Sequence, residues 1–181
     1  MKKALYILAE ISDRDFEWIL SVGRSKRVTA GTTLIYEGEP IDAIYIVLEG
    51  TLAVCVESLG GEEVARLGHG EVVGEMSFVD ARRPSATVKA VEDSLVFTIP
   101  RSQLAAKLAQ DLSFSSHFYQ ALAIFLSDRL RSTVSRLGYP KETFAAPPPQ
   151  PSSEDENHYL EDSLRLAEAR LDWMLNRLKG R

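Results

Sequence analysis

The stretch GEMSFVDARRPSATVKA, residues 74–90, is the most informative part of this sequence. Gly74 and Glu75 open it, a pair of arginines lies near its middle, and the small residues 85–87 close it. Glycine lets a backbone approach a ligand closely, and arginine matches the oxygens of a phosphate group. The stretch therefore predicts a site for an anionic ligand, with Pro84 as the residue that does not fit.

The regions around this stretch have the pattern of an α+β fold. Ser12 and the acidic residues after it predict a helix that ends at Gly23. From Arg27 to Pro100, short β-rich runs alternate with glycine turns, a spacing typical of an antiparallel jelly-roll barrel rather than a parallel sheet. The runs are RVTAGTTLIYEGEP, AIYIVLEGTLAVCVE, EEVARLG and SLVFTIP.

Helical periodicity returns after this β-rich region. We expect a short helix over residues 101–110 and a long one over about 113–137, which Gly138 and Pro140 end. The first predicted domain therefore spans residues 1–140.

Two further parts follow this domain. Residues 141–157 are rich in proline and acidic residues, the composition of a linker. Residues 158–181 predict an amphipathic helix, because their apolar positions alternate steps of four and three as in a coiled-coil seam. These positions are Leu160, Leu164, Ala167, Leu171, Met174 and Leu178.

The composition excludes several classes of protein. The 181 residues, 45% of them hydrophobic, suffice for one domain with an appendage, and a net charge of −5 argues against a DNA-binding protein. No window reaches the roughly 18 apolar residues of a membrane span. The apolar stretch 4–11 is too short for a secretory signal, so we expect no membrane association and a cytoplasmic location.

No pattern predicts a metal site or catalysis. Cys55, the single cysteine, lies in an apolar strand and is expected to be a small buried side chain. His69, His117 and His158 have no metal-ligand spacing, and no segment resembles a nucleophile elbow. We therefore expect a protein that is not an enzyme and holds no cofactor.

Together these features resemble the cyclic nucleotide-binding domain, the sensor module of bacterial catabolite-activator-type regulators and of eukaryotic kinase regulatory subunits. The resemblance extends over about residues 13–137. It rests on the strand YIVLEG, on glycines at the expected turns, and on GEMSF and SATVKA, which are similar to the family's phosphate-binding cassette. The resemblance implies that cyclic AMP or cyclic GMP is the ligand.

The resemblance also implies roles for the first cassette residues. Glu75 would accept a hydrogen bond from the ribose 2′-hydroxyl, a bond strengthened by the carboxylate charge. Gly74 would let the backbone approach the ligand. Met76 and Ser77 lie in residues 75–79, which resemble a short helix whose free N–H groups face the cyclic phosphate.

The remaining implied site residues lie farther along the chain. Ser85 and Ala86 match small residues that offer further hydrogen-bond donors, and Thr87 matches a position that often contacts the base or the phosphate. From the long helix, Thr133 lies near the position of a polar residue that caps the base.

One position departs from the family pattern. The family places an arginine directly before the small pair, whereas this chain has the order Arg83, Pro84, Ser85. Pro84 has neither a guanidinium nor an N–H. A charge-assisted bond contributes about 1.5–3 kcal/mol, so its loss corresponds to about 10- to 150-fold in affinity. Either Arg82 or Arg83 reaches the site instead, or both belong to a solvated loop.

The sequence after the long helix predicts how the protein acts. A linker and one helix cannot supply a helix-turn-helix domain with a basic face, so no DNA binding is expected. The family's long helix pairs two subunits, which implies a homodimer. We expect the C-terminal helix to dock on a second subunit or another protein, the alternative being that it folds back onto its own domain.

Two functions follow from different classes. In the first, the chain is a stand-alone cyclic-nucleotide sensor or adaptor whose ligand rearranges the helices and thereby regulates a partner. In the second, the pocket is degenerate and binds no cyclic nucleotide, and the chain is a protein-interaction module that docks through its C-terminal helix.

Overall fold

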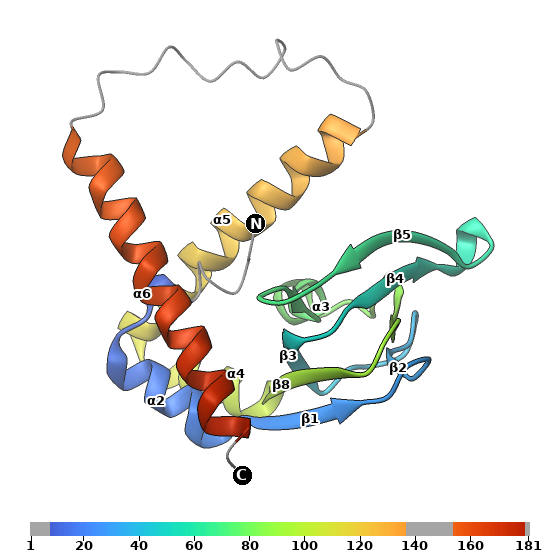
Figure 1. Ribbon diagram of the computed structural model, residues 1–181, viewed down its shortest axis with the longest axis horizontal. Helices are drawn as coiled ribbons and strands as arrows, with labels where there is room; N and C mark the ends of the chain where they lie inside the picture. Colours follow the sequence, from blue (N-terminus) through green and yellow to red (C-terminus); the bar gives the residue numbers. More distant parts are fainter. Residues whose placement is uncertain (1–7, 137–153, 180–181) are drawn as a thin grey trace.

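The computed structural model describes residues 8–136 and 154–179 (Figure 1). Eight strands form two antiparallel sheets, and the long helices gather at one end of them. The strands are β1 (Arg24–Val28), β2 (Thr33–Ile35), β3 (Ala43–Glu49), β4 (Leu52–Val56), β5 (Glu62–Leu67), β6 (Val72–Val73), β7 (Thr87–Ala90) and β8 (Ser94–Pro100). The helices are α2 (Asp13–Val22), α3 (Glu75–Asp80), α4 (Arg101–Gln110), α5 (Leu112–Arg136) and α6 (Glu154–Lys179).

The α+β class, with helices before and after the sheets, is confirmed, but the expected barrel is not closed. The sheets have the orders β1-β8-β3-β6 and β2-β7-β4-β5 and enclose a core that includes Val47, Leu52 and Val96. Strand β6 has only two paired residues before Gly74, at a φ of 89°, turns the chain into α3. Because this edge strand is so short, no ladder links it to the second sheet.

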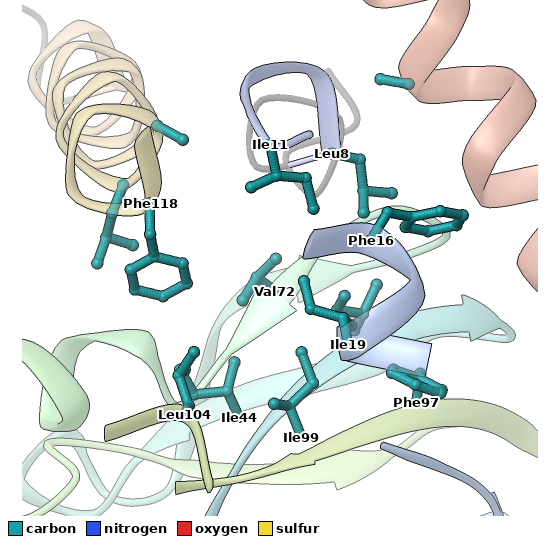
Figure 2. Packing of buried hydrophobic residues seen from close by; sticks show 14 of the residues in the cluster. Leu8, Ile11, Phe16, Ile19, Ile44, Val72, Phe97, Ile99, Leu104 and Phe118 are labelled. Carbon is teal, nitrogen blue, oxygen red and sulfur yellow. The ribbon is translucent and has the colours of Figure 1, made fainter. Parts of the chain in front are cut away.

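A second core lies between the first sheet and the helices (Figure 2). Ile44 and Ile99 rise from the sheet toward Ile19 of α2 and Phe118 of α5. The boundaries of α2 follow from the sequence: the Ser12 hydroxyl accepts a hydrogen bond from the Asp15 N–H, and the helix ends before Gly23. This core fixes the direction in which α5 leaves the domain.

Lys107 joins three helices through a small polar network. Its Nζ lies 2.7 Å from Asp111 Oδ2 and 3.1 Å from Asp15 Oδ1, and it lies 5.2 Å from the centre of the Phe114 ring. The hydrogen bond with Asp111 is the main cause that raises the pKa of Lys107, and it lowers the pKa of Asp111. Asp111 also caps α5, because its Oδ1 accepts the Phe114 N–H at 3.0 Å.

Helix α6 folds back onto its own domain. Ala167, Leu171 and Met174 are at most 1% exposed and belong to the same core as Phe16 and Phe118. The expectation that this helix docks elsewhere is therefore wrong for these positions. An apolar seam is buried by any matching apolar face, and the face formed by the N-terminal residues and α2 lies within reach.

Three details of the C-terminal prediction complete this comparison. The helix begins at Glu154 instead of residue 158. The rest of the predicted linker, up to residue 153, and the end of the first predicted domain, residues 137–140, lie outside the described residues. So do the side chains of Leu160, Leu164 and Leu178.

A buried arginine anchors α6. Arg170 is 7% exposed, and its guanidinium donates hydrogen bonds to the carbonyls of Leu8 and Ile11 and to the carboxylate of Asp13. It also lies 5.5 Å from the centre of the Phe16 ring. These carbonyls need donors, because a buried acceptor without a partner costs free energy. One side chain therefore ties the C-terminal helix to the N-terminal residues.

We predict that Arg170→Ala lowers the free energy of unfolding by about 2–4 kcal/mol, because it leaves buried carbonyls without donors. Arg177→Ala is the matched control: Arg177 is half exposed and 3.7 Å from Glu17, so its loss should cost less than about 0.5 kcal/mol. Urea denaturation measures both. Equal losses would contradict the anchoring role of Arg170.

The lowered pKa of Asp111 predicts a dependence of stability on pH. Because the pKa is lower in the folded protein, the stabilisation is complete above the unfolded value and is lost as the pH falls through the folded value. Asp111→Asn keeps a capping side chain and removes the charge. Its free energy of unfolding should therefore change less than that of the wild type between about pH 7 and about pH 3, and parallel curves would refute this.

Candidate functional site

A cavity of about 790 Å³ lies between the second sheet, α3 and α5. Its apolar walls come from the strands and include Val54, Val64 and Val88. Its polar lining comes from α3, the loop before β7 and α5. The cavity thus joins two segments of the chain that are far apart in sequence, the cassette and the long helix.

Gly74 positions the cassette at the floor of the cavity. Its φ of 89° is accessible mainly to glycine, and an added Cβ would lie 3.0 Å from the carbonyl oxygen of Ala43. The turn brings Glu75, the first residue of α3, into the interior with 2% exposure. Ser77 is also buried, whereas Met76 is half exposed, and all four residues line the cavity.

The buried Glu75 carboxylate has a cationic partner from α5. A guanidinium nitrogen of Arg129 forms an ion pair with Glu75 Oε1 across 54 residues of sequence. The side chain of Arg129 is 27% exposed, and its guanidinium lies 5.2 Å from the centre of the Phe125 ring. A buried carboxylate needs such a partner, because an uncompensated charge in the interior is costly.

Sequence reasoning missed Arg129. The signal was present, because Arg129 lies one helical turn before Thr133, on the same face of the long helix. Thr133 lines the cavity as expected, and its hydroxyl donates a 2.9 Å hydrogen bond to the Arg129 carbonyl. The long helix therefore brings a cation as well as a polar cap to the cavity.

The two arginines of the cassette lie outside the cavity lining. Arg82 is exposed, with its Nε 3.7 Å from Asp80. Arg83 is also exposed, and it donates a 2.8 Å hydrogen bond to the carbonyl of Gly38. In this arrangement neither replaces the guanidinium that the family places at position 84.

The small residues after them divide into two groups. Pro84, Ser85 and Ala86 line the cavity, and the Pro84 carbonyl accepts the Gly38 N–H at 2.9 Å. Thr87 is not part of the lining. Its hydroxyl accepts the Glu37 N–H at 3.1 Å and so holds the loop that faces β7.

The structure was also searched for other kinds of site within residues 8–136 and 154–179. In this part of the chain no three His, Cys, Asp or Glu side chains gather as a metal ion would require. None of its helices is both long and apolar enough to cross a membrane. The same residues include no separate helix-turn-helix domain. Cys55 is buried and free, as expected.

Comparison with known proteins adds independent evidence on the family. Residues 25–111 match the family described as the cyclic nucleotide-binding domain. The chain is 32% identical over 123 residues to the cyclic AMP receptor protein of Thermus thermophilus, over 67% of this chain and 55% of the relative. It is 28% identical over 133 residues to lysophospholipase nte1 of Emericella nidulans, over 72% of this chain and 8% of the relative.

The fold has a solved counterpart in the catabolite activator protein of Thermus thermophilus. The TM-score is 0.61 at 27% identity, and the match covers 74% of this chain and 62% of that one. The present chain thus spans about half the length of the receptor protein and a small part of the lipase. By both sequence and fold, residues 25–111 belong to the cyclic nucleotide-binding domain family.

Proposed function

We propose that this chain is a sensor or adaptor that binds a cyclic nucleotide, cyclic AMP or cyclic GMP, and regulates a protein partner through its helices. The observation that carries the proposal is the composition of one cavity. The cassette residues Gly74, Glu75 and Ser85 share it with Arg129 and Thr133 of α5. A ligand in that cavity would contact both the fixed cassette and the helix that leaves the domain.

Each cavity residue has a role in this proposal. The Glu75 carboxylate accepts a ribose hydroxyl, and Ser85 offers a donor to the phosphate. Thr133 caps the base. Met76, Ser77 and Ala86 shape the floor and rim, and the backbone at Gly74 approaches the ligand.

The Glu75–Arg129 pair supplies a route from the ligand to the helices. Among the described side chains of α5 beyond Phe125, none is buried, so packing holds this part of the helix weakly. The ion pair with Glu75 ties it to the cassette. A ligand that hydrogen-bonds Glu75 alters this tie and shifts the balance between two positions of the helix.

We infer that the output passes through α5 and α6. Residues 112–125 of α5 share a core with α6, so a shift of α5 changes the face on which α6 packs. Helix α5 also exposes Tyr119 and Leu130, at 46% and 64%, as the expected homodimer would require. A protein partner that recognises α6, a dimeric state and a cytoplasmic location belong to this proposal.

Pro84 favours a second candidate function. With no guanidinium at this position and with Arg82 and Arg83 outside the lining, the chain would keep the fold as a protein-interaction module that binds no cyclic nucleotide. The same titration decides between the two candidates.

We predict that cyclic AMP or cyclic GMP binds the wild type and that Glu75→Gln weakens binding by about 10- to 100-fold, because an amide accepts hydrogen bonds less strongly than a carboxylate. Glu17→Gln on α2, with 59% exposure, is the matched control and should bind as the wild type does. Calorimetry measures the affinities, and amide hydrogen exchange of residues 126–136 reports the helix.

Three outcomes decide this proposal. Binding with altered exchange in α5 supports the sensor. Absence of heat and of a melting-temperature shift at about millimolar ligand, far above the usual range of a specific site, would leave the interaction module as the function. Equal affinities for the Glu75 and Glu17 variants would contradict the role of the carboxylate.

We further predict that Pro84→Arg tightens cyclic-nucleotide binding by about one to two orders of magnitude, the gain from one charge-assisted bond. Pro84→Ala is the control, because it restores the N–H without adding a guanidinium. Calorimetry with the same nucleotide compares the three proteins. An unchanged affinity in Pro84→Arg would mean that another group already serves the phosphate.

A further inference from the structure

The charges around the cavity say more about its ligand. We propose that the cavity prefers an uncharged purine nucleoside over the corresponding cyclic nucleotide. This proposal rests on the function proposed above, because it concerns the ligand of the same cavity. It differs in the chemistry selected, namely a ribose and a base without a phosphate charge.

The described lining carries no excess of positive charge. Its charged residues are two cations, Arg66 and Arg129, and two carboxylates, Glu71 and Glu75. Arg66 forms an ion pair with Glu63, at 2.6 Å from Nε to Oε1, and Arg129 forms one with Glu75. Each cation of this lining thus already compensates a carboxylate.

The nearest further cations are held away from the cavity. Arg83 donates to the Gly38 carbonyl at 2.8 Å, and the Pro84 carbonyl accepts the Gly38 N–H at 2.9 Å. These two bonds fasten the loop to the turn at Gly38 on both sides of the peptide that joins Arg83 to Pro84. Arg82 extends toward Asp80, with 85% exposure.

A cyclic phosphate carries a negative charge that this lining does not compensate. To serve the phosphate, Arg129 would have to share or leave Glu75, a carboxylate that is 2% exposed. A buried carboxylate that loses its partner is costly, and two anions at short range repel each other. Moreover, Pro84 offers no N–H to the phosphate.

An uncharged nucleoside meets none of these costs. A carboxylate accepts about four hydrogen bonds, so Glu75 can accept a ribose hydroxyl while it stays paired with Arg129. The purine ring would pack on the apolar walls, which include Val54, Val64 and Val88. Serine at position 85 offers a hydroxyl to the 5′ end of the nucleoside.

The test compares four compounds on the full chain by calorimetry: adenosine, guanosine and their 3′,5′-cyclic monophosphates. For the purine that binds, we expect the nucleoside to bind the wild type at least about tenfold more tightly than its cyclic phosphate. In Pro84→Arg the order should reverse, whereas Pro84→Ala should keep the wild-type order. A thermal denaturation curve of each variant confirms that it is folded.

Two further measurements sharpen the result. Nucleoside affinity should be nearly the same at about 50 mM and about 500 mM salt, because no ligand charge is screened. The 2′-deoxynucleoside should bind more weakly by about tenfold if Glu75 accepts the 2′-hydroxyl.

The outcomes separate this inference from the proposed function. A cyclic nucleotide that binds the wild type as tightly as its nucleoside, or more tightly, overturns the inference and leaves the cyclic-nucleotide sensor intact. A nucleoside that binds while its cyclic phosphate does not supports the inference and redirects the sensor to nucleosides. If none of the four compounds binds, both proposals fail.

Discussion

The geometry of this protein depends on how a buried carboxylate is compensated. Gly74 adopts a conformation that other residues rarely adopt, and it turns Glu75 into the interior beneath the second sheet. A charge in that position requires a cation, and Arg129 of α5 supplies it. The path of the long helix and the position of the cassette are therefore not independent, since one ion pair joins them.

A second arginine has a similar part at the other end of the helical layer. Arg170 satisfies the carbonyls of Leu8 and Ile11 and so fastens α6 to the N-terminal residues. The two arginines differ in what surrounds them. Arg170 lies in a core with little exposure, whereas Arg129 borders a cavity that a ligand can enter. The first contact is suited to holding a structure together, the second to changing with a ligand.

Much of the fold was predictable because it depends on local signals. The Ser12 cap and Gly23 bound α2, glycine turns separate the strands, and the apolar spacing of residues 167, 171 and 174 marks the buried face of α6. The cassette residues Gly74, Glu75, Ser77 and Ser85 line one cavity, as their resemblance to the family led us to expect. In contrast, the closure of the barrel and the partner of α6 depend on contacts between distant segments, which local spacing does not define.

The sequence by itself determined which residues form the cassette, where the helices begin, and that proline stands where the family has arginine. Only the tertiary structure decided which cation reaches the cassette. Arg83 is one residue from the missing position, yet a hydrogen bond to Gly38 turns it outward. Arg129, which is 54 positions from Glu75, lies within ion-pair distance of it. The physical reason is that a buried charge is compensated by whichever group the packed helices bring near it, and nearness in space is set by packing rather than by separation along the chain.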